Sequence, residues 1–302
     1  MTGFAHTSVL VDEVLAALAP RPGGLYADLT VGGGGHAAAV LERSAPDGRL
    51  IGLDRDPAAL AAARARLAPF GDRVTLVHST LSRLPEVLDE ARVDALDGVL
   101  ADLGVSSPQL DVASRGFSFA EDGPLDMRMD PTRGETALDL IARLDADALA
   151  DVLFEYGEER RSRPVARSIR AAYDAGELHT TGDLRRAVVR VLGPKRGRID
   201  PATRTFQALR IAVNQELDEL RALVGALPDV LGDGGVAAII SFHSLEDRIV
   251  KRAFRDDPRL TPLSKKPLVP TETERAQNPR ARPAKLRAAR RRARTLDRPE
   301  AA

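Results

Sequence analysis

Four consecutive glycines, Gly32 to Gly35, lie between a short apolar run and a segment with helical periodicity. Glycine allows the backbone to turn tightly and lets a ligand approach the chain closely. A strand that passes through such a turn into a helix is typical of α/β folds that bind a nucleotide-like cofactor. We therefore expect a parallel sheet, with the cofactor at the carboxyl end of its first strand.

Short β-like runs alternate with helical patterns over the first hundred residues. The strands are expected at 25–31, 49–54, 73–78 and 97–102. Strands that alternate with helices predict a parallel sheet with right-handed crossovers. The alternation stops after Asp102 and resumes later in the chain. The second block comprises a helix at about 205–223, a strand at 235–241 and a helix from Ser244.

The intervening segment carries helical patterns at 137–153, 163–175 and 183–192. The sequence therefore predicts a doubly wound α/β domain with a mostly parallel sheet, interrupted by a helical insertion domain. The expected boundaries give a first part at 1–110, the insertion at 111–204 and a second part with a basic tail at 205–302. Residues 257–283 are expected to form an extended loop. The Arg/Ala tract at 285–294 is compatible with a short strand, a helix or a disordered tail.

The amino-acid composition excludes several classes of protein and of site. The 302 residues are 43% hydrophobic, but the longest apolar stretches, such as Val236 to Ile240, are far below the roughly 20 residues of a membrane helix. No membrane span is expected. The first ten residues lack the basic and apolar segments of a secretory signal, which favours a cytoplasmic protein. Cysteine is absent, which excludes disulfides, thiolate zinc sites and a thiol nucleophile.

Charge is segregated along a chain whose formal net charge is zero. Residues 160–210 hold 13 Lys or Arg against 4 Asp or Glu, and residues 251–302 hold 16 against 6. Such clustering is typical of a protein that binds a polyanion, although solvated helix faces give the same pattern. The residues expected to grip RNA are Arg160, Arg161, Arg163, Arg167, Lys195, Arg196 and Arg198.

Two acidic residues indicate which class of cofactor the glycine turn binds. Asp54 lies about 20 residues beyond the glycine turn, where a carboxylate meets a ribose. This pattern suits both a nicotinamide cofactor and S-adenosylmethionine. Asp28 directly precedes the turn and would repel a pyrophosphate, whereas a cofactor with a sulfonium and an ammonium group would tolerate it. The residues therefore favour the methyl donor.

Several strings in the chain resemble one family. They include Asp102-Leu-Gly-Val-Ser-Ser-Pro-Gln, Tyr156-Gly-Glu-Glu-Arg and Ser241-Phe-His-Ser-Leu-Glu-Asp-Arg. Others are His6-Thr-Ser-Val-Leu, Arg115-Gly-Phe-Ser-Phe, Gly123-Pro-Leu-Asp-Met-Arg-Met-Asp-Pro, Pro201-Ala-Thr-Arg-Thr-Phe-Gln-Ala-Leu-Arg-Ile and Asn278-Pro-Arg-Ala-Arg. Together they resemble the RsmH (MraW) family, bacterial methyltransferases that modify cytosine N4 in small-subunit ribosomal RNA. The resemblance covers nearly the whole chain.

The resemblance implies a Rossmann-like class I methyltransferase domain that uses S-adenosylmethionine to methylate a cytidine in the decoding region. It also implies a set of donor-binding residues: Gly34, Gly35, His36, Asp54, Leu81, Asp102 and Gln109. Two positions depart from the family pattern: relatives often carry a larger residue in place of Gly33, and some carry Phe in place of Leu81. A smaller side chain at Leu81 would weaken the contact with adenine.

The residues themselves leave the catalytic group open. Methyl transfer is an in-line displacement, so alignment of the reacting groups supplies most of the rate. Ser107 lies in a polar turn, which is a candidate for binding the cytosine amine. The alternative is that this turn only connects the sheet to the insertion. His243 is a candidate proton acceptor, although a structural role is more common for such a histidine. The absence of cysteine argues against carbon-5 methylation, which ordinarily uses a thiolate.

Three further expectations concern partners and ligands. Asp122, Asp126 and Asp130 lack the spacing of a calcium loop, so no metal is expected. Small-subunit ribosomal RNA is the expected partner, and a homodimer is left open. The alternatives are a nicotinamide-dependent dehydrogenase and a catalytically silent ribosome-assembly factor.

Overall fold

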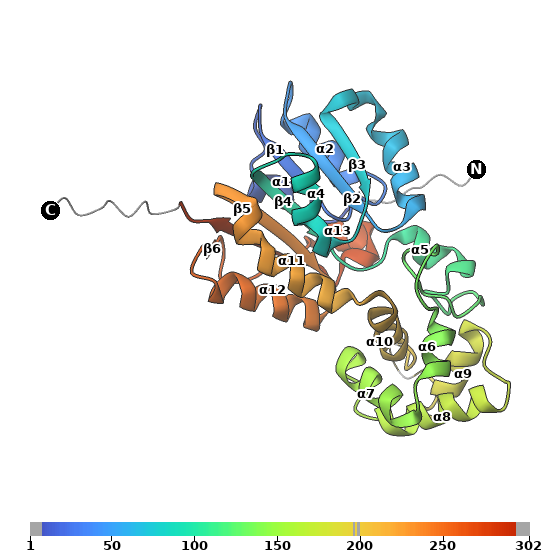
Figure 1. Cartoon of the computed structure of the whole chain (residues 1–302). Helices are drawn as coiled ribbons and strands as arrows, with labels where there is room; N and C mark the ends of the chain where they lie inside the picture. The colour runs from blue at the N-terminus through green and yellow to red at the C-terminus, as the bar shows by residue number, and fades with distance from the viewer. Residues whose placement is uncertain (1–7, 196, 198–199, 294–302) are drawn as a thin grey trace. The chain divides into compact units, whose positions relative to one another are not determined.

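The computed structural model describes residues 8–195, 197 and 200–293 (Figure 1). The chain divides into two compact units: residues up to Gly104 together with those from Asp218 onward, and Val105–Leu217. The expected break at 204/205 falls inside a helix of the second unit, because that helix buries Phe206 and Leu209 in the unit's core. Within the described residues, no helix has the length and apolar character needed to cross a membrane.

The first unit contains a seven-stranded sheet in the order β3-β2-β1-β4-β5-β7-β6. Neighbouring strands from β3 to β5 run parallel, and β7 is antiparallel to both β5 and β6. The strands are β1 (Leu25–Asp28), β2 (Arg49–Asp54), β3 (Val74–His78), β4 (Leu96–Asp102), β5 (Leu231–Ser241), β6 (Leu260–Pro262) and β7 (Lys285–Arg291). This arrangement confirms the predicted α/β, Rossmann-like fold with a mostly parallel sheet.

Helices cover both faces of this sheet. Successive strand residues point to opposite faces, so Leu50 and Leu100 pack with α1, α2 and α3, while Leu53 and Ala101 pack with α4, α11 and α12. The helices of this unit are α1 (Val11–Leu18), α2 (Gly35–Arg43), α3 (Pro57–Leu67), α4 (Leu84–Glu90), α11 (Glu216–Val230), α12 (Ser244–Asp256) and α13 (Glu272–Gln277), with α11 beginning just before the division between units.

The second unit is helical and has its own apolar core, which includes Leu149, Val165 and Leu209. We refer to it as the helical unit. Its helices are α5 (Ser107–Asp111), α6 (Ala137–Arg143), α7 (Ala146–Gly157), α8 (Ser162–Asp174), α9 (Thr181–Leu192) and α10 (Thr203–Asn214). A long irregular segment lies between α5 and α6, and the side-chain amide of Asn214 holds it by contacts to the backbone of Met127 and Met129.

Several expected elements have different bounds. The helix predicted at 205–223 is two helices, because Gln215 adopts a left-handed conformation with φ of 51°. The helix predicted at 137–153 is likewise divided, since the Asp145 side chain caps a new helix by accepting from the amide of Ala148. The expected loop at 257–283 contains β6 and α13. The tract from Lys285 forms strand β7.

Candidate functional site

The glycine turn connects β1 to α2 at the carboxyl edge of the sheet. Gly34 precedes the helix with φ of 79°, a left-handed conformation that favours glycine. The turn is tied to neighbouring strands, since the Leu29 amide donates to the Leu100 carbonyl and the Val31 amide donates to that of Leu53, each at 2.9 Å. A Cβ atom on Gly35 would overlap with the Ser8 hydroxyl. The backbone here is therefore held in one tight conformation.

Asp54 ends β2 beside this turn. Its carboxylate accepts hydrogen bonds from the amides of Gly32, at 2.9 Å, and Asp56, at 2.8 Å. Burial nevertheless raises the pKa of Asp54 to about 6, against those two bonds. The residue thus links the glycine turn to the end of β2, at the position predicted for a ribose contact.

Asp28 and Asp102 end the two central strands, β1 and β4. Burial raises the pKa of Asp28 to about 7 and that of Asp102 well above its usual range, and each has another carboxylate as a secondary cause. Thr30 lies between them: its amide donates to Asp28 at 3.2 Å, and its hydroxyl accepts from the Asp102 amide at 2.6 Å. Oδ1 of Asp102 is buried without a hydrogen-bond partner among the described residues. Such a carboxylate is costly unless a cation or a donor compensates it.

His36 is buried in the first turn of α2. Its Nε2 atom lies 2.9 Å from the Val9 carbonyl oxygen, and its Nδ1 atom lies 3.8 Å from Oδ2 of Asp102. The structure therefore brings His36 next to Asp102, as two members of one predicted site. Its ring also ties the segment before α1 to the glycine turn.

The other predicted donor residues lie in different surroundings. Leu81 begins a short 3₁₀ helix, η2 (Leu81–Arg83), which starts three residues after the end of β3. Its side chain packs against the core on the α4 side of the sheet. Gln109 and Ser107 both belong to α5 in the helical unit. Gln109 is buried and forms a capping box, in which its side chain accepts from the Ser106 amide at 3.0 Å. Ser107 is the first residue of that helix.

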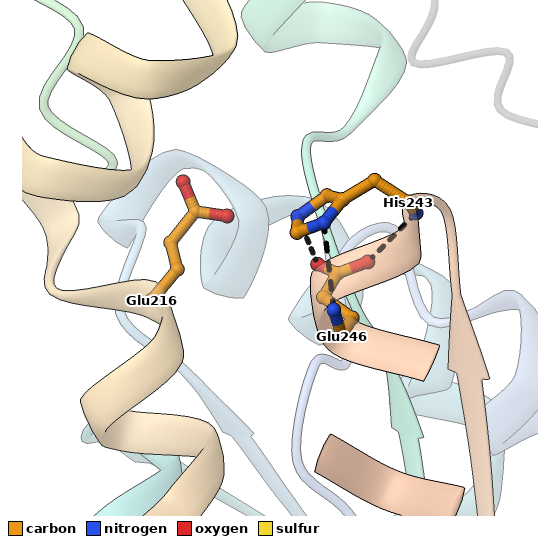
Figure 2. A group of neighbouring side chains, drawn as sticks. All are labelled: Glu216, His243 and Glu246. Atoms are coloured by element: carbon orange, nitrogen blue, oxygen red, sulfur yellow. Dashed lines mark hydrogen bonds and ion pairs between the residues drawn. The ribbon is translucent and has the colours of Figure 1, made fainter. Parts of the chain in front are cut away.

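His243 caps the N-terminus of α12, as Figure 2 shows. Its Nδ1 atom accepts from the Glu246 amide at 3.5 Å, and the Glu246 carboxylate accepts in return from the amides of Phe242 and His243. Asp247 forms an ion pair with Arg287 of β7, at 2.7 Å. The arrangement gives His243 a structural role at the start of the helix, and proton transfer by this residue stays a prediction.

The acidic residues considered for a metal have protein partners. Asp126 binds the Arg128 guanidinium, Asp130 binds Thr132 and Arg133, and Asp122 accepts from the Gly182 amide. These contacts explain each carboxylate as part of the scaffold of the helical unit. Among the basic residues predicted to bind RNA, Arg196 and Arg198 lie outside the described residues.

Comparison with known proteins identifies the family. A family model described as the MraW methylase family matches residues 3–292. The chain belongs to the MraW methylase family. Membership covers both units, since the match extends from the first residues through β7.

Individual members of this methylase family are closely similar in sequence to this chain. A "Ribosomal RNA small subunit methyltransferase H" of Sorangium cellulosum (strain So ce56) is 61% identical, over 96% of this chain and 91% of its own. A protein of the same name from Prochlorococcus marinus (strain MIT 9303) is 55% identical, over 96% of this chain and 94% of its own. One solved structure, a putative rRNA-methylase from Clostridium thermocellum, aligns with 94% of this chain and 98% of its own, at 11% identity and a TM-score of 0.46.

Sequence reasoning did not foresee two features of this methylase's site. Thr30 was not predicted, although its hydroxyl and amide connect Asp28 with Asp102. A polar residue two positions after a strand-terminal Asp was the available signal. Asp28 was noted only for its effect on cofactor choice, because the depth of its burial depends on the packing of strands distant in sequence.

Proposed function

We propose that this protein transfers a methyl group from S-adenosylmethionine to the N4 amine of one cytosine in the decoding region of small-subunit ribosomal RNA. The observation that carries the donor assignment is the group of three carboxylates at the ends of adjacent strands, Asp28, Asp54 and Asp102. The names of the relatives support ribosomal RNA of the small subunit as the substrate. That substrate implies a cytoplasmic enzyme.

The site suits the donor's chemistry. S-adenosylmethionine has a ribose, which Asp54 would bind, and a sulfonium and an ammonium group, which Asp28 and Asp102 would stabilise. Burial raises the pKa values of all three residues, so a nearby cation would favour their ionised forms. The buried Oδ1 atom of Asp102 could accept from the ammonium. A pyrophosphate cofactor would instead add negative charge beside these carboxylates.

Leu81 would contact the adenine, since it follows β3, the strand next to the one that ends in Asp54. Gly34, Gly35 and His36 would approach the methionine portion of the donor. Gln109 is the weakest member of the predicted donor set, because its side chain already caps α5. These assignments give each residue a separate effect on donor affinity.

The reaction itself needs alignment more than a covalent intermediate. The donor supplies an electrophilic methyl group, and the protein must hold the cytosine amine in line with the breaking bond. Hydrogen-bond acceptors would raise electron density on that amine, and Ser107 is the proposed acceptor. The lack of cysteine favours attack by the exocyclic nitrogen over carbon-5 chemistry.

The deciding experiment uses small ribosomal subunits that lack the modification, incubated with the protein and S-adenosylmethionine carrying a labelled methyl group. Mass spectrometry of the nucleosides should detect labelled N4-methylcytidine. Label in another nucleoside would overturn the substrate atom but keep the methyl transfer. Binding to subunits without any label would favour a silent assembly factor, and thermal stabilisation by NAD instead of S-adenosylmethionine would favour a dehydrogenase. Sedimentation would test the homodimer.

A further inference from the structure

The arginines of the helical unit differ in whether their side chains have protein partners. Eight form an ion pair with an Asp or Glu: Arg128, Arg133, Arg143, Arg170, Arg185, Arg186, Arg190 and Arg210. Arg115 and Arg204 donate to backbone carbonyl groups. Most of the described arginines of this unit therefore already have a partner within the protein.

Four arginines that lie close together in the sequence have no such partner among the described residues. The side chains of Arg160, Arg161, Arg163 and Arg167 are exposed, and they have neither an ion pair nor a hydrogen bond among the described residues. We call these four the α8 arginine face. Arg160 and Arg161 directly precede α8, which Figure 1 labels in the helical unit, and Arg163 and Arg167 lie in its first half.

The periodicity of α8 directs this charge to solvent. Val165, Ala166 and Ile169 are buried in the core of the helical unit, so Arg163 and Arg167, four residues apart, share the opposite side of the helix. Like charges at this spacing repel each other by a few tenths of a kcal/mol in a helix. The first turn of α8 has no acidic residue that would offset them.

The neighbouring acidic residues do not neutralise the face. Glu159 is buried, and its carboxylate accepts from the Arg161 amide at 2.8 Å, not from the guanidinium. Glu158 adopts a left-handed conformation at the end of α7, and its carbonyl oxygen accepts from Arg204 at 3.4 Å. The Glu159 carboxylate thus binds the backbone of this turn, and the guanidinium groups of the α8 arginine face stay available.

We propose that the α8 arginine face binds backbone phosphates of the ribosomal RNA that surrounds the target cytosine. This inference rests on the proposed function. Guanidinium groups bind phosphate through paired hydrogen bonds as well as charge, and they need no particular base sequence. Each phosphate neutralised releases counterions from the RNA, so such contacts have a measurable salt dependence. The paired arginines of the same unit would contribute much less, because a carboxylate already occupies each of them.

The test compares two variants with the same change in charge. The first carries Arg160→Gln, Arg163→Gln and Arg167→Gln. The control carries Arg143→Gln, Arg186→Gln and Arg190→Gln, whose arginines are exposed and paired with Glu135, Asp183 and Glu177. Binding to unmodified small subunits and to the naked ribosomal RNA is measured across a range of salt concentrations. Circular dichroism and S-adenosylmethionine affinity check that both variants are folded.

The first variant should bind both RNA targets on the order of 100-fold more weakly near physiological salt, and its log–log salt slope should be smaller by roughly 2 to 3. The control should resemble the wild type. Equal slopes for the first variant and the wild type, or equal losses in both variants, would overturn the inference. A loss on assembled subunits but not on naked RNA would assign the face to a ribosomal protein instead. Failure of the wild type to methylate any subunit would count against the proposed function alone, because binding is measured separately.

Discussion

Oδ2 of Asp102 lies 3.8 Å from Nδ1 of His36, whose other ring nitrogen lies 2.9 Å from the Val9 carbonyl oxygen. A carbonyl only accepts hydrogen bonds, so Nε2 carries a hydrogen and a neutral ring would turn its lone pair toward Asp102. At 3.8 Å the ring does not form a hydrogen bond with Oδ2, and Oδ1 of Asp102 has no hydrogen-bond partner among the described residues. A bound cation is the group that would supply the compensation.

Substitution Asp102→Asn tests that role. The amide keeps the shape of the carboxyl group but removes its charge, so S-adenosylmethionine affinity should fall about 10- to 100-fold, as for a lost hydrogen bond to a charged group. The protein without ligand should melt at a higher temperature at pH 8, because the amide removes the cost of burying a carboxyl group that is ionised in the unfolded chain. Calorimetric titration and thermal melts measure the two effects. Unchanged donor affinity would remove Asp102 from the site.

The carboxylates also predict how stability depends on pH. The pKa values of Asp28 and Asp54 are raised from 3.8 to about 7 and about 6, so the folded protein holds protons that the unfolded chain has released. Their stabilising contribution is complete below about pH 4 and is lost as pH rises through about 6 for Asp54 and about 7 for Asp28. Urea unfolding of the protein without ligand should therefore show this decline, and Asp28→Asn should reduce it near pH 7.

The affinity for S-adenosylmethionine should change in the opposite direction. A cationic ligand binds the ionised carboxylates better, so its affinity should increase between about pH 5 and pH 8. Titration at constant ionic strength measures this trend. S-adenosylhomocysteine, which lacks the sulfonium charge, is the matched ligand and should show a weaker dependence. An affinity that is flat or that falls across this range would contradict the proposed pairing of cation and carboxylates.

The glycine turn gives a prediction about stability. Gly34→Ala would place a Cβ atom 3.2 Å from Leu67 in a residue with φ of 79°. A left-handed alanine costs about 1–2 kcal/mol, so the free energy of unfolding should decrease by at least that amount. Gly225→Ala is the control, because that site in α11 has open space and alanine favours a helix. An equally stable Gly34→Ala protein would show that the turn adapts.

Two substitutions distinguish the roles of His243. If the residue caps α12, Asn should replace it with little loss, whereas Ala should reduce stability by about 1 kcal/mol. Methylation by the Asn variant should then stay near the wild-type rate. Loss of kcat in both variants, with normal melting temperatures and donor affinity, would instead indicate proton transfer by the imidazole.

Local sequence patterns predicted the part of the fold that local interactions determine. The four strands before Asp102 and the glycine turn have short apolar runs and turn residues that are informative by themselves. The division of one predicted helix at Gln215 was not predicted, since nothing in that residue type requires a left-handed conformation. The burial of Asp28 likewise depends on strands far apart in the chain.

The conformation of β7 is a second feature that local sequence patterns could not predict. Its Arg/Ala composition is not typical of a buried strand, and the sequence left three conformations open. In the structure, Ala288 and Ala289 are buried, while Arg287 binds Asp247 and Arg291 donates to the Pro228 carbonyl. Those partners lie 40 and 63 residues away. Long-range pairing, which a local pattern does not contain, decides the conformation.

The position of β7 between β5 and β6 sets an order of events during protein synthesis. Every residue of the helical unit precedes position 218, so that unit can fold while the ribosome is still adding the strands that follow. In contrast, β5 gains its second neighbour only after residues 285–291 have been made. The nascent sheet thus keeps an open edge until almost the whole described chain has emerged. Premature termination near residue 280 would leave a complete helical unit attached to an aggregation-prone sheet.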